Sequence, residues 1–173
     1  ALYRKLNRKD DIRKTLATVT ALDPADVASL KELGDIDNAA GFPKQALGSY
    51  LAILKVQPNN FEALYQSGVI YFNDKAFAQA VQNLSLAVKQ QSNSVKASLA
   101  LADALTASGK AADAVVYYSA VLQSEPKNEA VVDKLVGVYR TLNNKTKLLE
   151  LLTKKVELNP RAGDAVSEIG ELQ

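Results

Sequence analysis

Apolar residues recur along most of the chain at steps of three and four residues, the spacing of one face of an α-helix. Leu30, Leu33 and Ile36 form one such run, and a second run begins at Pro43, just after the helix-breaking Gly41. No segment shows the two-residue alternation of a half-buried strand. The pattern therefore predicts an all-α protein built from short helices joined by tight turns.

These two runs make a unit of thirty-four residues that is repeated without gaps along the chain. Four of the five prolines are separated by this period or twice this period: Pro24, Pro58, Pro126 and Pro160. An internal period of this length is typical of stacked two-helix units, each of which buries its apolar face only against its neighbours. We therefore predict a single domain over residues 1–173. Its repeats are 27–60, 61–94, 95–128 and 129–162, preceded by a partial repeat at 1–26 and followed by a terminal helix at 163–173.

The residues at the ends of the predicted helices agree with this division. The last place of successive repeats holds residues whose side chains favour the N-cap of the next helix, namely Asp26, Asn60, Ser94 and Asn128. The place between the two helices of each repeat holds residues that, except for Lys75, tolerate the left-handed conformation that ends a helix: Asn7, Gly41, Lys75, Gly109 and Asn143. We therefore expect helices at 1–7, 9–22, 26–40, 43–56, 60–73, 77–90, 94–107, 111–124, 128–141, 145–158 and 162–173.

Two further places in the repeat are occupied mostly by small residues. The eighth place holds Gly34, Gly68, Ala102, Val136 and Gly170, and the twentieth holds Ile12, Ala46, Ala80, Ala114 and Leu148. We expect these places to face a neighbouring helix, because small side chains let two helices approach closely. Leu in place of Ala80 or Ala114 would then cost about 1–3 kcal/mol through overpacking.

With these residues in place, the pattern resembles the tetratricopeptide repeat, and the resemblance covers the whole chain. In the first full repeat it is carried by Leu30, Leu33, Gly34, Ala46, Tyr50, Ile53 and Pro58, and in the second by Leu64, Gly68, Tyr71, Ala80, Leu84 and Ala87. In the third it is carried by Leu101, Ala102, Gly109, Ala114, Tyr118 and Pro126, and in the fourth, which departs most from the pattern, by Leu135, Tyr139 and Pro160. The resemblance implies a right-handed α-α superhelix of about five helix-turn-helix units with truncated ends. It also implies that the first helix of each pair lines a concave groove, and that the protein binds other proteins and is not itself an enzyme.

Composition excludes most catalytic and metal sites. The chain has no His and no Cys, so zinc sites, thiol nucleophiles and most general bases are absent, and no glycine-rich phosphate loop is present. The segment 35–38 is similar to the start of a calcium loop, but it lacks the glycine at the sixth place and has Ala46 where the acid at the twelfth should stand. We therefore expect no cofactor and no metal.

The charges do not favour nucleic acid as a partner. The net charge is only +2. Residues 1–14 and 140–161 are each basic, but neither has aromatic residues interleaved for base stacking, and solvated helix faces are the favoured interpretation. No apolar run is long enough to predict membrane insertion, and the compartment stays open because a chain without Cys fits any of them.

Asp37 stands at a place where the other repeats have Tyr or Leu and where a side chain should be half-buried. A buried carboxylate needs a partner. We expect Asp37 either to tilt toward water or to pair with a Lys or Arg of a neighbouring helix. The alternative is that it contacts a ligand.

The groove is the surface on which we expect a partner to bind. In this family the second, fifth, sixth, ninth, twelfth and thirteenth places tend to face the groove. In the second and third repeats these places supply an amphipathic set, because apolar and aromatic side chains are flanked by polar ones. The predicted peptide-binding residues are Tyr65, Gln66, Val69, Phe72, Asn73, Lys96, Leu99 and Asp103. The alternative is that Phe72 and Leu99 seal the junction between repeats.

Three functional hypotheses remain open from the sequence. The first is a scaffold that binds a protein or peptide partner, such as a partner helix, in the groove. The second is a structural or self-associating segment of a longer repeat array, in which the truncated ends pair and the groove has no ligand; the chain begins without Met, as expected of a mature product or an excised piece. The third is an enzyme whose catalytic domain lies outside this piece.

Overall fold

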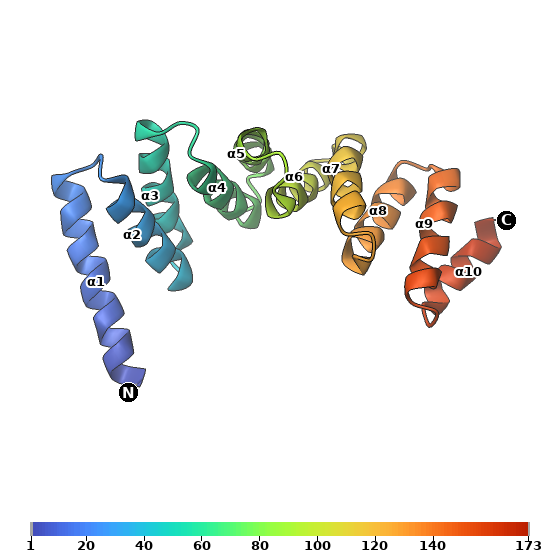
Figure 1. Cartoon of the computed structure of the whole chain (residues 1–173), viewed down its shortest axis with the longest axis horizontal. Coiled ribbons are helices and arrows are strands. Elements are labelled where there is room, and N and C mark those ends of the chain that lie inside the picture. The colour runs from blue at the N-terminus through green and yellow to red at the C-terminus, as the bar shows by residue number, and fades with distance from the viewer. Residues whose placement is uncertain (1, 173) are drawn as a thin grey trace. The chain divides into compact units, whose positions relative to one another are not determined.

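The computed structural model describes the backbone of residues 2–172 and the side chains of residues 8–172. Within this range the chain forms ten α-helices and no strand. The predicted all-α class is confirmed, although the sequence predicted eleven helices. The chain divides into two compact units, and the boundary between them in the sequence falls after Gln91. Figure 1 shows the helices of each unit as successive antiparallel hairpins.

The first unit consists of five helices, each packed on the next one in sequence. The long helix α1 comes first, and two helical hairpins follow it. The bounds are α1 (Leu2–Leu22), α2 (Val27–Ala39), α3 (Pro43–Val56), α4 (Phe61–Asn73) and α5 (Phe77–Gln90).

The second unit also has five helices, two hairpins and a last single helix. Here too, each helix packs on its neighbour in sequence. The bounds are α6 (Val95–Ala107), α7 (Ala111–Ser124), α8 (Glu129–Thr141), α9 (Lys145–Leu158) and α10 (Gly163–Leu172).

The helices α2, α4, α6 and α8 begin where the predicted capping residues stand. The side chains of Asp26, Asn60, Ser94 and Asn128 each accept a hydrogen bond from the backbone N–H three residues on. Such a cap satisfies one of the donors that the first turn of a helix leaves open. Because these bonds depend on local chemistry alone, the predicted and observed starts agree to within one residue.

The turns inside the hairpins are left-handed at one fixed place of the repeat. Gly41 and Gly109 have φ of 81° and 80°, and Lys75 and Asn143 have φ of 61° and 53°. The sequence predicted this conformation for three of them but not for Lys75. Lys75 adopts it although a Cβ disfavours it. The backbone bond from Ala76 N–H to Tyr71 O, at 2.8 Å, closes the turn in the same way as the bond from Phe42 to Asp37 in the preceding repeat.

The predicted break at Asn7 is wrong. Instead of separate helices at 1–7 and 9–22, the backbone forms one helix from Leu2 to Leu22; residue 1 lies outside the described range. This stretch contains neither Gly nor Pro, so nothing in it opposes a continuous helix, and a break would give up backbone hydrogen bonds. The side chain of Ile12, predicted to face a neighbouring helix, is 43% exposed on this helix.

Close packing between paired helices occurs at the predicted small residues. A Cβ built on Gly34 would lie 2.9 Å from Tyr50 Cε1, and one built on Gly68 would lie 2.6 Å from Leu84 Cγ. Ala102 is fully buried. The twentieth place is buried as well in every full repeat, at Ala46, Ala80, Ala114 and Leu148. In the first three full repeats the hairpins therefore close tightly because these places lack bulk, whereas Val136 and Leu148 fill them in the fourth. Gly170, which was also predicted to face a neighbouring helix, is exposed, and a Cβ there would meet nothing within 4 Å.

Each unit has its own apolar interior. In the first unit a cluster from α2, α3 and α4 is formed by Leu30, Ala46, Tyr50, Ile53, Ala63 and Ile70. In the second unit the largest fully buried side chains are Leu101, Tyr118, Val121, Val131, Val132, Leu135, Val138 and Leu152. Burial of each such side chain contributes about 1.5–3 kcal/mol, and this packing holds the first helix of every hairpin in place.

Candidate functional site

The places expected to face the groove are accessible in every full repeat. None of their side chains is fully buried. In the second and third repeats the predicted binding residues lie on α4 and α6, which belong to different units, so each helix face is described by itself.

On α4 the aromatic residues are fixed by contacts along and across the hairpin. Tyr65 is half-buried and stacks on Phe61 with the ring centroids 6.2 Å apart. Phe72 is half-buried and meets Phe77 of α5 at a centroid distance of 5.8 Å. The rings are therefore held in defined positions, and each keeps part of its surface exposed.

Polar side chains flank these rings on the same helix. Gln66 Nε2 donates to Glu62 Oε1 at 2.7 Å. Asn73 is exposed at the end of the helix, and Val69 is half-buried one turn before it. The face is thus apolar along its middle and polar at its edges.

On α6 the three predicted residues lie on one helix face at spacings of three and four. Lys96 is exposed and Leu99 is half-buried. Asp103 Oδ1 accepts from the hydroxyl of Tyr118 at 2.5 Å and from Lys134 Nζ at 2.6 Å. The carboxylate, 28% exposed, is therefore oriented by two donors from α7 and α8.

The first repeat contains a similar arrangement, which the sequence analysis missed. Tyr50 on α3 donates to Asp35 Oδ1 on α2 at 2.8 Å, and Lys31 Nζ lies 2.5 Å from Asp35 Oδ2. We call the Asp–Tyr pairs of the first and third repeats the hairpin braces. Burial, and then the hydrogen bond to Asp35, raise the pKa of Tyr50 above the ordinary value of a phenol. Burial and Asp103 raise the pKa of Tyr118 in the same way.

A sequence signal for the braces exists. Asp at the ninth place and Tyr at the twenty-fourth are separated by fifteen residues in both repeats. In the second and fourth repeats the same places hold Val69 with Leu84 and Gly137 with Leu152. These residues have no polar side-chain atoms, so they cannot form this hydrogen bond. The ninth place was interpreted only as facing the groove, whereas in two repeats it also ties the hairpin together.

Asp37 pairs with an Arg of a neighbouring helix, which is one of the two arrangements that the sequence predicted for it. Its side chain is buried, and Arg13 Nε of α1 donates to Asp37 Oδ1. The guanidinium carbon of Arg13 also lies 4.4 Å from the ring centroid of Phe42, at the turn between α2 and α3. Arg13 thereby joins α1 to both other helices of this region, and its charge compensates the buried carboxylate.

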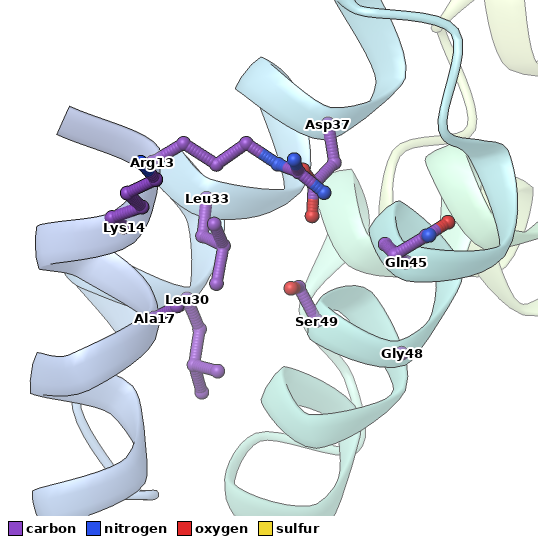
Figure 2. A pocket seen from close by; sticks show the side chains of 9 residues that line it. All are labelled: Arg13, Lys14, Ala17, Leu30, Leu33, Asp37, Gln45, Gly48 and Ser49. Carbon is purple, nitrogen blue, oxygen red and sulfur yellow. The ribbon is translucent and has the colours of Figure 1, made fainter. Parts of the chain in front are cut away.

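A hollow of about 540 Å³ lies between α1, α2 and α3 and was not predicted from the sequence. Figure 2 shows Arg13 crossing its upper end to Asp37, with Leu30 and Leu33 below. We call it the α1–α3 hollow. It is lined by Arg13, Lys14, Ala17, Leu30, Leu33, Asp37, Gln45, Gly48 and Ser49.

The described part of the chain holds no cluster of three or more acidic residues able to bind a metal ion. The two carboxylates of the calcium-like segment are engaged elsewhere, Asp35 with Tyr50 and Asp37 with Arg13. Across residues 2–172, none of the helices combines the length and apolar character needed to cross a membrane.

Comparison with known families decides the classification. Two models described as tetratricopeptide repeat match the chain, one over residues 33–95 and the other over residues 71–139. The chain belongs to the tetratricopeptide repeat family. The repeat period and the small residues of the sequence indicate the same family, and the all-α repeat fold that the resemblance implied is confirmed.

Solved structures of tetratricopeptide repeat proteins share this fold. YrrB, described as a TPR protein with an unusual peptide-binding site, is 19% identical with a TM-score of 0.83, over 96% of this chain and 86% of its own. MamA is 19% identical with a TM-score of 0.81, over 93% and 88%. A MamA piece from Desulfovibrio magneticus RS-1 is 22% identical with a TM-score of 0.73, over 87% and 84%. No curated protein sequence matches the chain significantly.

The tetratricopeptide repeat fold is typical of protein–protein interaction scaffolds, and its members are typically not enzymes. The family thus gives the class of function, whereas the binding surface and the chemistry of the partner must be argued from the exposed helix faces.

Proposed function

We propose that this tetratricopeptide repeat chain is an interaction scaffold that binds a peptide or a partner helix through the exposed face of α4 in the first unit, with the exposed face of α6 as a separate contact surface on the second unit. The observation that carries the proposal is the face of α4, where Tyr65, Val69 and Phe72 recur at helical spacing and stay partly exposed. The peptide-binding site of YrrB supports this class of partner by analogy of fold.

The α4 face offers aromatic rings on which a partner can pack and an amide that can form hydrogen bonds with it. The rings of Tyr65 and Phe72 are already positioned by Phe61 and Phe77, so little side-chain entropy is lost when a partner covers them. Asn73 at the edge supplies an amide that can donate to and accept from a peptide backbone. Rigid aromatic anchors with polar edges are typical of interface hot spots.

The α6 face would contribute charge as well as an apolar contact. Lys96 and Asp103 lie on either side of Leu99 along the helix. The bonds of Asp103 to Tyr118 and Lys134 hold the carboxylate in one orientation, which suits it to accept from a partner's Lys, Arg or backbone N–H. We expect an affinity in the micromolar range, about −8 kcal/mol.

The first experiment replaces the aromatic anchors. Short peptides selected from a displayed library on the wild-type chain supply the probe, and fluorescence anisotropy measures binding. Tyr65→Ala and Phe72→Ala should each weaken binding by roughly tenfold or more, as expected for a loss above about 1.4 kcal/mol at a hot spot. Circular dichroism should show unchanged helical content.

Phe77→Ala is the matched control, because it removes the ring contact with Phe72 from the α5 side. If Phe72→Ala and Phe77→Ala weaken binding equally, Phe72 acts through packing and not through contact with the peptide. Wild-type affinity in both Tyr65→Ala and Phe72→Ala would exclude the α4 face as the binding surface.

A further inference from the structure

The α1–α3 hollow has an apolar floor that belongs to no groove-facing place of the repeat. Leu30 and Leu33 of α2 are buried and form part of its lining, and Ala17 adds a methyl group from α1. Gly48 of α3 contributes no side chain, and a Cβ placed there meets no heavy atom within 4 Å. The space is therefore open to an apolar group of moderate size.

A hydroxyl group of α3 is directed into this space. Ser49 is 7% exposed, and its hydroxyl oxygen points into the hollow (Figure 2). Among the side chains of residues 8–172 and the backbone around them, nothing forms a hydrogen bond with that hydroxyl. By contrast, the Ser67 hydroxyl on α4 donates to Ala63 O at 2.6 Å. None of the sealed side-chain oxygens of the described residues lacks a partner, so the Ser49 oxygen is reached by solvent, and the hydroxyl can donate to or accept from a ligand that enters the hollow.

The charges around the hollow leave one positive charge uncompensated. Arg13 and Asp37 neutralise each other across its upper end. Lys14, one residue on, is exposed and lies beyond ion-pair distance of every carboxylate in the described side chains. Gln45 adds an exposed amide on the α3 side. The rim thus favours an occupant with a single negative charge.

We propose that the α1–α3 hollow is a second binding site, which takes an aliphatic side chain of a partner peptide in which an acidic residue stands beside it. The aliphatic group would lie on Leu30 and Leu33, the peptide backbone would bond to the Ser49 hydroxyl, and the carboxylate would face Lys14. Charge complementarity favours this occupant, because a basic peptide would meet Lys14 and Arg13. The site is separate from α4 and α6, so its failure would leave the proposed groove function untouched.

The probes are two peptides with fluorescein on the N-terminal amine, Ser-Asp-Leu-Ser-Ser-amide and its counterpart with Lys in place of Asp. Binding to the full chain is followed by anisotropy, and amide chemical shifts of residues 13–17 and 45–49 locate the contact. The acidic peptide should bind and shift these resonances. The basic peptide should bind at least tenfold more weakly.

Gly48→Leu should fill the hollow, since Gly48 lines it and a Cβ placed there meets no neighbouring atom within 4 Å. It should weaken binding of the acidic peptide at least tenfold. Gly170→Leu is the matched control, because Gly170 is also helical and open, and it should leave binding unchanged. Ser49→Ala should weaken binding about threefold, the size expected for one net hydrogen bond.

Lys14→Glu alters only an exposed side chain and keeps the proposal testable if Gly48→Leu disturbs folding. It should reverse the preference in favour of the basic peptide. Equal binding of the acidic peptide to the wild type and to Gly48→Leu with intact helical content would overturn the proposal. So would equal affinity for both peptides in the wild type. If isocaproate alone competes as strongly as the acidic peptide, the site recognises a free acid, and the assignment to a peptide is wrong.

Discussion

Arg13 shows how a single side chain can fix the position of a helix. It reaches from α1 to a carboxylate on α2 and to the ring of Phe42. The sequence predicted that Asp37 would pair with a base or turn to water, but it could not name Arg13. Which basic residue pairs with Asp37 depends on the direction and packing of α1, and the sequence predicted two helices in this stretch instead of one.

Arg13→Ala should lower the free energy of unfolding by about 1–3 kcal/mol, because it leaves Asp37 buried without a counter-charge. This is below the range for a fully buried pair, since the Arg13 side chain is 31% exposed. Asp37→Leu in the same chain should recover most of the loss, as Leu105 occupies this place in the third repeat. Urea denaturation followed by circular dichroism measures both. A double variant no more stable than Arg13→Ala would show that the ion pair is not the cause.

Gly68 and Gly48 both lie within helices, but a Cβ would be crowded at Gly68 and would have open space at Gly48. At Gly68 a methyl group would press on Leu84, which is fully buried and cannot move aside, so Gly68→Ala should destabilise by about 1–3 kcal/mol. At Gly48 the methyl group meets nothing, so Gly48→Ala should stabilise by up to about 1 kcal/mol through helix propensity. The midpoints of urea denaturation should move in opposite directions. A shift of equal sign for the two variants would contradict the packing described for Gly68.

At the scale of the helix, local chemistry was sufficient wherever a cap or a turn residue decides the boundary. Asp26 and Asn60 accept the capping bonds predicted for them, and Gly41 and Gly109 form the predicted turns. Prediction failed where the outcome depends on packing between helices. Lys75 is held left-handed within its hairpin, and the α1–α3 hollow depends on how three helices meet. The groove residues stay a prediction, because accessibility alone does not show what they bind.

The last helix, α10, is held largely by charged side chains. Arg140 on α8 forms two hydrogen bonds with Glu168, at 2.8 and 2.5 Å, and Lys155 Nζ on α9 lies 3.0 Å from Asp164. Only Ala165 of this helix is fully buried among its described residues. We therefore expect α10 to depend on pH more than its neighbours.

The hydrogen bond from Arg140 lowers the pKa of Glu168 below its ordinary value, which is about 4.3. A lowered folded-state pKa contributes stability that is present above the ordinary value and is lost as the pH falls through the folded value. The Cα chemical shifts of residues 163–172 should therefore move toward coil values between about pH 5 and pH 2, before those of α9. Glu168→Gln should weaken this transition. An identical acid transition in wild type and variant would rule out Glu168 as its origin.

At the scale of the molecule, each of the two units contains one braced hairpin and one hairpin without a brace. Tyr50 and Asp35 brace the hairpin of α2 and α3, and Tyr118 and Asp103 that of α6 and α7. The phenols are buried, and each hydroxyl donates a hydrogen bond to a carboxylate. Ionisation of either phenol would place a second negative charge beside the partly exposed carboxylate of Asp35 or Asp103.

The raised pKa of Tyr50 and Tyr118 gives an alkaline limit to stability. The folded-state pKa of these phenols lies above the ordinary phenol pKa of about 10. The stability that the two phenols contribute is therefore complete below about pH 10 and is lost as the pH rises through the folded-state pKa. Tyrosinate absorbance should therefore show a late fraction that appears only together with the loss of helical content. The variant Tyr50→Phe/Tyr118→Phe should lack this fraction. If it persists there, other tyrosines are its source.

The alternation of the braces has a consequence for how such a chain can grow by duplication. Asp and Tyr recur at the same places after sixty-eight residues, not thirty-four, and so do the glycines of the turns at Gly41 and Gly109. A duplication of two hairpins would preserve this order, whereas duplication of one would put two hairpins of the same kind in succession. In the pattern of braces and turn glycines, the repeating unit is therefore four helices long.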